Sequence, residues 1–257
     1  VERAVFLTVL HRLFNAGSYL PVLRQTDRSA DKWRRRYALE GVEGLELHHL
    51  YRAMSWLGEP LPDGEQEGAT PFSPRCVKDL VEEGFFAFGR DLFSQLELVF
   101  FDTTSIYFEG QGGESLGRCG NTKDRRADHH QMVVGLVLDG SGRPLCCELW
   151  PGNTTDVKTL LPVADRLRSR FGIDRVCVVA DAGMISAQTK AELEARGWTY
   201  ILGARMRRQK EVCDEVLSRA GRYRVVRPER ERAKDQSPLK VKDVRVEDRS
   251  YVVCLNE

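Results

Sequence analysis

Residues 96–108, Leu-Glu-Leu-Val-Phe-Phe-Asp-Thr-Thr-Ser-Ile-Tyr-Phe, decide the fold class of this chain. The stretch is rich in aliphatic and aromatic residues, as is typical of a buried strand, and its most apolar part ends on the carboxylate Asp102. A second run of this kind, residues 175–181 (Arg-Val-Cys-Val-Val-Ala-Asp), ends on Asp181. The sequence therefore predicts two core strands that each end their apolar run on an aspartate.

The segments around these runs predict three further strands and two helices. We expect strands at residues 130–138, 144–150 and 198–203. We expect helices at residues 156–171 and 185–196. The turn sequence Asp139-Gly-Ser-Gly142 favours an antiparallel hairpin, and Thr154, Thr155 or Asp156 is the expected cap of the first helix. Three antiparallel strands followed by helix, strand, helix and strand is the order of a ribonuclease-H-like α/β core, which we predict for residues 96–205.

Two different regions flank the predicted core. Residues 1–95 have apolar positions at helical spacing and read as a helical amino-terminal region with a possible role in DNA binding. Its last helix, about 75–95, contains four phenylalanines that we expect in the core rather than stacked on bases, namely Phe85, Phe86, Phe88 and Phe93. Residues 206–257 contain short alternating strands and read as the beginning of a β-rich, basic insertion subdomain that is incomplete.

Composition excludes several classes of protein. The 257 residues are 42% hydrophobic and 30% charged, which argues against a disordered chain, and no apolar run reaches the roughly 18–20 residues of a membrane span. The amino end has no signal-peptide cleavage site, and its first residue, Val1, suggests a fragment or an unusual start codon. The seven cysteines lack the spacing of a zinc site, so we expect free thiols in the cytoplasm.

The net charge of +1 hides a basic carboxy-terminal segment. Residues 206–257 hold 14 Lys and Arg against 10 Asp and Glu, a net charge of +4. We expect such a basic segment to bind nucleic acid, although an ordinary solvent-exposed surface can also carry this many basic residues.

Asp102 and Asp181 are the strongest candidates for chemistry. Ligands of open α/β sheets bind beyond the strand ends, and the ribonuclease-H-like order places these two strands side by side. Carboxylate oxygens bind divalent cations, and two ions roughly 3.5–4 Å apart can clamp the attacking and leaving oxygens of a phosphodiester. The alternative is that each aspartate only caps a turn or the following helix. This role is common for a single aspartate at the end of a strand, but two aspartates in matching positions of neighbouring strands favour a functional site.

These residues also carry a family resemblance. Residues 101–205 resemble the catalytic core of DDE-type insertion-sequence transposases in four motifs: Phe101-Asp-Thr-Thr-Ser-Ile-Tyr-Phe-Glu-Gly110, Lys123-Asp-Arg-Arg-Ala-Asp128 with Gln131, Pro151-Gly-Asn-Thr-Thr-Asp156, and Val179-Ala-Asp-Ala-Gly-Met184. The resemblance implies that Asp102 and Asp181 are the first two members of a catalytic triad and ligands of two Mg²⁺ or Mn²⁺ ions. It also implies hydrolysis at transposon ends followed by strand transfer into target DNA, by a protein that is a homodimer on double-stranded DNA.

The chain departs from the family pattern in its third carboxylate. In this family a glutamate on a helix follows the β-rich insertion, whereas this sequence reaches Glu257 inside the predicted insertion, and we do not assign Glu257 the role. We therefore expect the 257-residue chain alone to be largely inactive in strand cleavage.

Two groups of basic residues are candidates for DNA contact. Lys123, Arg125 and Arg126 precede the second strand, and the resemblance suggests contact with phosphates near the cleavage site, whereas a solvated hairpin with local ion pairs is the simpler interpretation. Arg207, Arg208 and Lys210 begin the basic carboxy-terminal segment.

Three other functions stay open. The chain could be a non-catalytic DNA-binding derivative of a transposase, or a ribonuclease-H-like nuclease without strand transfer. A haloacid-dehalogenase-like phosphohydrolase would also carry a strand-end aspartate followed by Thr104, but that fold needs parallel strands with helices between them, against the hairpins expected here.

Overall fold

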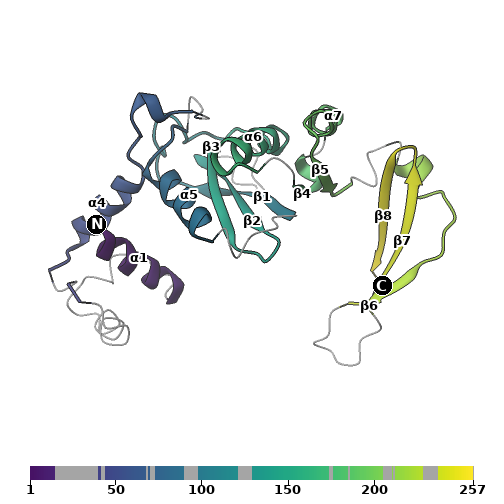
Figure 1. The fold of residues 1–257 in the computed structure, drawn as a ribbon, viewed down its shortest axis with the longest axis horizontal. Helices are drawn as coiled ribbons and strands as arrows, with labels where there is room; N and C mark the ends of the chain where they lie inside the picture. Colours follow the sequence, from purple (N-terminus) through teal and green to yellow (C-terminus); the bar gives the residue numbers. More distant parts are fainter. Residues whose placement is uncertain are drawn as a thin grey trace.

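The computed structural model describes residues 1–14, 40–41, 44–67, 69, 73–89, 98–120, 129–173, 176–184, 186–204, 210, 212–227 and 237–256 (Figure 1). The helices are α1 (Glu2–Phe14), α4 (Leu47–Leu57), α5 (Val77–Gly89), α6 (Leu160–Phe171) and α7 (Ala187–Ala195), with short helical turns η1 (Asp63–Glu65), η2 (Asp156–Lys158), η3 (Ala182–Met184) and η4 (Val212–Val216). The strands are β1 (Leu98–Tyr107), β2 (Gln131–Asp139), β3 (Pro144–Pro151), β4 (Cys177–Ala180), β5 (Thr199–Leu202), β6 (Arg224–Arg227), β7 (Leu239–Val246) and β8 (Arg249–Asn256).

Five strands form the central sheet, in the order β3-β2-β1-β4-β5. β1 pairs antiparallel with β2, and β2 pairs antiparallel with β3. β4 lies parallel to β1 on its other side, and β5 lies parallel to β4. With α6 between β3 and β4 and α7 between β4 and β5, this order confirms the predicted ribonuclease-H-like fold class.

One face of the central sheet is covered and the other is largely open. Side chains alternate along β1, so that Val99, Phe101 and Thr103 are buried while Phe100 and Asp102 are exposed. The apolar side of α6 packs on the covered face, where its leucines and valine join Trp150 and Phe101 in the main core. The sheet is therefore a one-sided platform within the described residues.

Helix α5 closes the free edge of β3. Lys78 Nζ donates to the backbone oxygen of Cys147 at 2.9 Å, and the Cys147 N–H donates to Glu82 Oε1 at 3.0 Å. These contacts satisfy the outward-facing backbone groups of an edge strand, which would otherwise be free to pair with another chain.

A buried ionic cluster fastens α5 to α6. The Arg170 side chain, which is 2% exposed, lies within 2.8–3.3 Å of Asp79, Glu82, Glu83 and Glu148. Burial by itself lowers the pKa of Arg170, but the hydrogen bonds with Glu83 and Glu82 and the charge of Asp79 outweigh it and raise that pKa. The sequence did not predict this cluster.

The phenylalanine prediction is partly wrong. Phe86 packs on the main core, edge-on to Phe171 with ring centroids 5.1 Å apart. Phe85 and Phe88 are 73% and 90% exposed, and Phe85 lines a large cavity beside α5 instead of packing in the core. Phe93 lies outside the described residues.

Two smaller units complete the structure. Helices α1 and α4 pack together through Leu7, Leu10 and Leu50. At the carboxy-terminal end, β6, β7 and β8 form a separate antiparallel sheet that packs against η4 and lies away from the central sheet in Figure 1. No helix among the described residues is long and apolar enough to cross a membrane.

Candidate active site

The register of the central sheet brings Asp102 and Asp181 together. The parallel ladder between β1 and β4 ends with the pair Phe101 and Ala180. Asp102 and Asp181 are the next residues on the two strands, and neighbouring strands lie about 4.8 Å apart. Strand β1 continues past Asp102 to Tyr107, as the run 96–108 predicts, so Asp102 lies where the parallel pairing ends and not at the end of the strand.

Asp102 belongs to the open face of the sheet, and Asp181 comes directly after the last residue of β4. Asp102 follows the buried Phe101 on β1, so the alternation of strand side chains directs its carboxylate away from α6. Both residues are exposed. The Thr103 N–H donates to Asp102 Oδ1 at 2.8 Å, which fixes the orientation of this carboxylate.

The donor set suits a divalent cation but is incomplete. Two neighbouring carboxylates offer the hard oxygen ligands that Mg²⁺ and Mn²⁺ prefer. Among the described residues, no group of three or more His, Cys, Asp or Glu side chains has an arrangement that could hold a metal ion. Asp102 and Asp181 therefore fit part of a metal site.

The motif at residues 151–156 has a different structural role from the expected helix cap. No side chain caps η2 or α6, and α6 begins only at Leu160. The Asp156 carboxylate instead accepts a hydrogen bond from Thr103 Oγ1 at 2.8 Å, across 53 residues of sequence. Apart from the presence of Asp156 in the motif, no sequence pattern predicts this contact.

The glycine of the same motif allows a close backbone crossing. A Cβ built on Gly152 would lie 2.1 Å from the backbone oxygen of Gln131 and 2.3 Å from that of Arg118, so no larger residue fits without movement. Gln131, which is fully buried, donates from Nε2 to the backbone oxygen of Gly152 at 2.8 Å. These contacts join the start of β2 to the segment that leads to Asp156.

The basic candidates are not brought to the acid pair by the described residues. Lys123, Arg125, Arg126, Arg207 and Arg208 all lie outside them. Lys210 is described and exposed, in the segment before η4. The DNA-contact role of all six residues stays a prediction.

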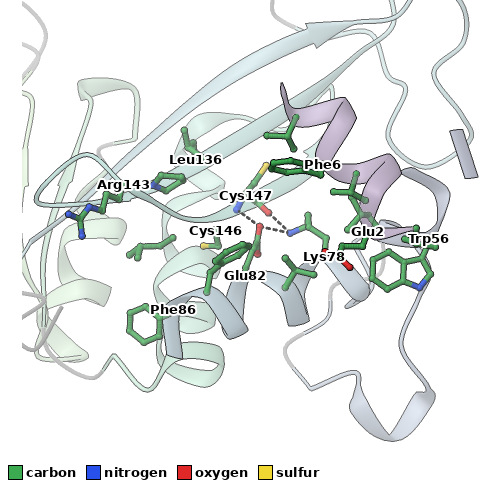
Figure 2. A pocket seen from close by; sticks show the side chains of 18 of the residues that line it. Glu2, Phe6, Trp56, Lys78, Glu82, Phe86, Leu136, Arg143, Cys146 and Cys147 are labelled. Carbon is green, nitrogen blue, oxygen red and sulfur yellow. Dashed lines mark hydrogen bonds and ion pairs between the residues drawn. The ribbon is translucent and has the colours of Figure 1, made fainter. Parts of the chain in front are cut away.

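A large apolar cavity lies between α1, α5 and the β2–β3 hairpin (Figure 2), and its lining residue Leu136 is the cross-strand partner of Asp102. Its volume is about 1230 Å³, and Phe6, Phe86 and Leu136 are among its lining residues. The two central polar side chains in Figure 2, Lys78 and Glu82, are hydrogen-bonded to each other and to the backbone of Cys147. Burial raises the pKa of the neighbouring Cys146 thiol to about 12, so this thiol is no nucleophile at neutral pH. The cavity therefore offers apolar packing and no catalytic group comparable to the acid pair.

The fold and the acid pair define the class of protein: a ribonuclease-H-like domain with one carboxylate on β1 and a second directly after the neighbouring strand β4. The sequence pattern of the Transposase DDE domain matches residues 94–252, which is more than half of the chain. The chain therefore belongs to the DDE transposase family, as the motifs predicted.

Solved transposase structures are similar to this chain at low identity. The Mos1 transposase paired-end complex with left transposon end shares 13% identity at a TM-score of 0.30, over 79% of this chain and 59% of that chain. The catalytic domain of Mos1 mariner transposase shares 16% sequence identity at a TM-score of 0.28, over 58% of this chain and 66% of that chain. The piggyBac transposase synaptic complex with hairpin DNA shares 15% sequence identity at a TM-score of 0.35, over 70% of this chain and 39% of that chain. No curated protein matches the chain.

Proposed function

We propose that this chain is the core of a DNA transposase that cuts transposon ends and joins them to target DNA, with Asp102 and Asp181 as its first two catalytic carboxylates. The observation that carries the proposal is the β1–β4 register, in which the two aspartates directly follow the Phe101–Ala180 pair. Membership of the DDE transposase family supports the same assignment.

The two carboxylates would hold divalent Mg²⁺ or Mn²⁺, two ions in the complete site. When bound, such ions polarise the scissile phosphodiester and lower the pKa of the attacking water or 3′-hydroxyl. The protein's own contribution is placement. Strand β1 is rigidly paired on both sides up to Phe101, and the Thr103 N–H orients Asp102 towards the open face, where a DNA backbone can approach.

The third carboxylate is expected to join the acid pair on the open face. This face exposes apolar side chains in the row next to Asp102: Phe100 (38%) and Ile201 (59%). A helix that carried a glutamate and covered these residues would complete both the core and the metal site. In its absence the chain should bind DNA but cut it poorly, since two carboxylates leave the ions incompletely held.

DNA is the proposed partner, bound by a homodimer. The β6–β8 sheet is proposed to be the start of the family's β-rich insertion, and residues 206–257 around it carry the net charge of +4. Lys123, Arg125, Arg126, Arg207, Arg208 and Lys210 are proposed to contact phosphates. All seven cysteines are free, as a protein of the reducing cytoplasm would have them.

Strand transfer is the experiment that tests this function. The full-length protein is incubated with Mn²⁺, DNA ends with free 3′-hydroxyls and a target plasmid. Joined products that disappear in Asp102→Asn and Asp181→Asn, with DNA binding retained, are the expected result. Ends that are cut and never joined would instead favour a nuclease. Binding without either reaction would favour a non-catalytic derivative.

A further inference from the structure

Asp156 contacts both of the segments that carry the acid pair. Its Oδ1 accepts the hydrogen bond from Thr103, the residue after Asp102. Its Oδ2 would lie 3.0 Å from a Cβ built on Gly183, two residues after Asp181. Asp156 itself comes from a third segment, the connection between β3 and α6.

Thr103 links Asp156 to Asp102. The Thr103 backbone N–H donates to Asp102 Oδ1, while its hydroxyl donates to Asp156 Oδ1, each at 2.8 Å. The Thr103 side chain is 4% exposed and lies on the covered face, opposite to Asp102. Asp156 therefore approaches from behind the strand and does not share a cation with Asp102, which agrees with the lack of a three-residue metal cluster among the described residues.

Asp156 contacts η3 beyond the end of the β1–β4 pairing, where backbone hydrogen bonds no longer fix the distance between the two chain segments. The β1–β4 ladder ends at Phe101 and Ala180, one residue before the two acids. Beyond it, Asp181 begins a turn in which its backbone oxygen accepts from the Met184 N–H at 3.1 Å. Gly183 lies in this turn, and its lack of a side chain allows Asp156 to come close. Asp156 thus bridges β1 and η3 just past the last paired residues.

We propose that Asp156 is a positioning residue, which sets the separation and orientation of Asp102 and Asp181 through Thr103 and the η3 turn. The inference rests on the proposed function, in which these two carboxylates hold the metal. A metal site tolerates displacements of only about 0.5 Å in its ligands, and loss of a group that orients a ligand typically lowers metal affinity about 10–100-fold.

Mn²⁺ affinity of the intact 257-residue chain, measured by electron paramagnetic resonance titration, tests the proposal. Asp156→Ala and Thr103→Val should each weaken binding about 10-fold. Thr103→Ser keeps the hydroxyl and should bind like the wild type. Asp165→Asn is the matched control, since this aspartate of α6 is 56% exposed and pairs only with Arg196 among the described residues, so its affinity should not change.

A second measurement separates positioning from general stability. Thr103→Val keeps the shape of a buried side chain but removes the hydroxyl that donates to Asp156, so its urea unfolding midpoint should fall, whereas Thr103→Ser should restore the midpoint and the Mn²⁺ affinity together. Mn²⁺ affinities are therefore compared without urea, under conditions in which circular dichroism shows every variant to be folded. Amide hydrogen exchange in residues 182–184 should become faster in Asp156→Ala and stay unchanged in Asp165→Asn.

The outcomes distinguish the two claims. If Asp102→Asn abolishes Mn²⁺ binding while Asp156→Ala and Thr103→Val bind normally, the positioning role is overturned and the metal site stands. If Asp102→Asn itself binds Mn²⁺ normally, the proposed metal site fails. The exchange rate of residues 182–184 then still decides whether Asp156 holds the two segments together, and an unchanged rate would overturn that as well.

Discussion

Replacing Arg170 with methionine should destabilise the protein by about 3 kcal/mol. The change removes the central cation of a cluster in which the side chains of Arg170 and Glu148 are 2% exposed and that of Asp79 is 5% exposed. Removing one partner of a buried ion pair costs roughly 3–5 kcal/mol, because the remaining charge stays buried. Each carboxylate here keeps a second cation, Lys78 for Asp79 and Glu82, Arg75 for Glu83, and Arg166 for Glu148, so the lower end of that range applies.

Urea unfolding followed by tryptophan fluorescence measures this cost, with Arg196→Met as the matched control. Arg196 also forms two ion pairs, but its partners Asp165 and Glu192 are 56% and 43% exposed, so its loss should cost less than about 1 kcal/mol. The melting temperature of Arg170→Met should fall by about 10 °C. A cost for Arg170→Met no larger than that of the control would refute the argument that this cluster holds α5 on the core.

Three further predictions concern acid stability, the motif glycine and the exposed phenylalanines. Burial raises the pKa of Asp79, but its hydrogen bond with Lys78 and the charges of Lys78 and Arg170 outweigh this and lower it. Its contribution to stability is therefore present above about pH 4 and is lost as the pH falls further. Arg170→Met brings the folded pKa of Asp79 closer to the unfolded one, so the unfolding free energy measured from pH 7 to pH 3 should fall less in this variant than in the wild type, and an equal or larger fall would contradict the coupling. Gly152→Ala should cost about 1–3 kcal/mol because its Cβ meets two backbone oxygens, whereas in Gly140→Ala the nearest atom is 3.7 Å away; equal unfolding free energies for the two variants would contradict the crossing described at Gly152. Phe88→Ser should change the unfolding free energy by less than about 0.5 kcal/mol, since the residue is 90% exposed, and a loss of several kcal/mol would place this side chain in a core.

The sheet order and the acid pair were predictable from the sequence because both depend on local patterns. Apolar runs of strand length, the Asp139–Gly142 turn and the helical period after Asp156 fix the type and order of the elements. Once the order is known, the ribonuclease-H-like topology makes β1 and β4 neighbours, and Asp102 and Asp181 meet as a consequence.

The contacts that support the site were not predictable because they join distant segments. Arg170 meets Glu82 and Glu83 across 88 and 87 residues of sequence, and such charges look solvated when read locally. Thr154, Thr155 and Asp156 are equal candidates for a helix cap in the sequence because all three precede an apolar helix, whereas the Asp156 carboxylate accepts a hydrogen bond from Thr103. Phe85 and Phe88 were assigned to a core because an aromatic cluster at helical spacing does not tell which side of the helix is covered.

The most direct test of the account is a double-mutant cycle on Mn²⁺ binding by the intact chain. If Asp102 and Asp181 hold the same ion, Asp102→Asn and Asp181→Asn should each weaken Mn²⁺ binding at least about 10-fold, and the double variant should be little worse than either single one, because the first substitution already removes the shared site. Independent, additive losses, or wild-type affinity in either single variant, would contradict the claim that the β1–β4 register builds one metal site.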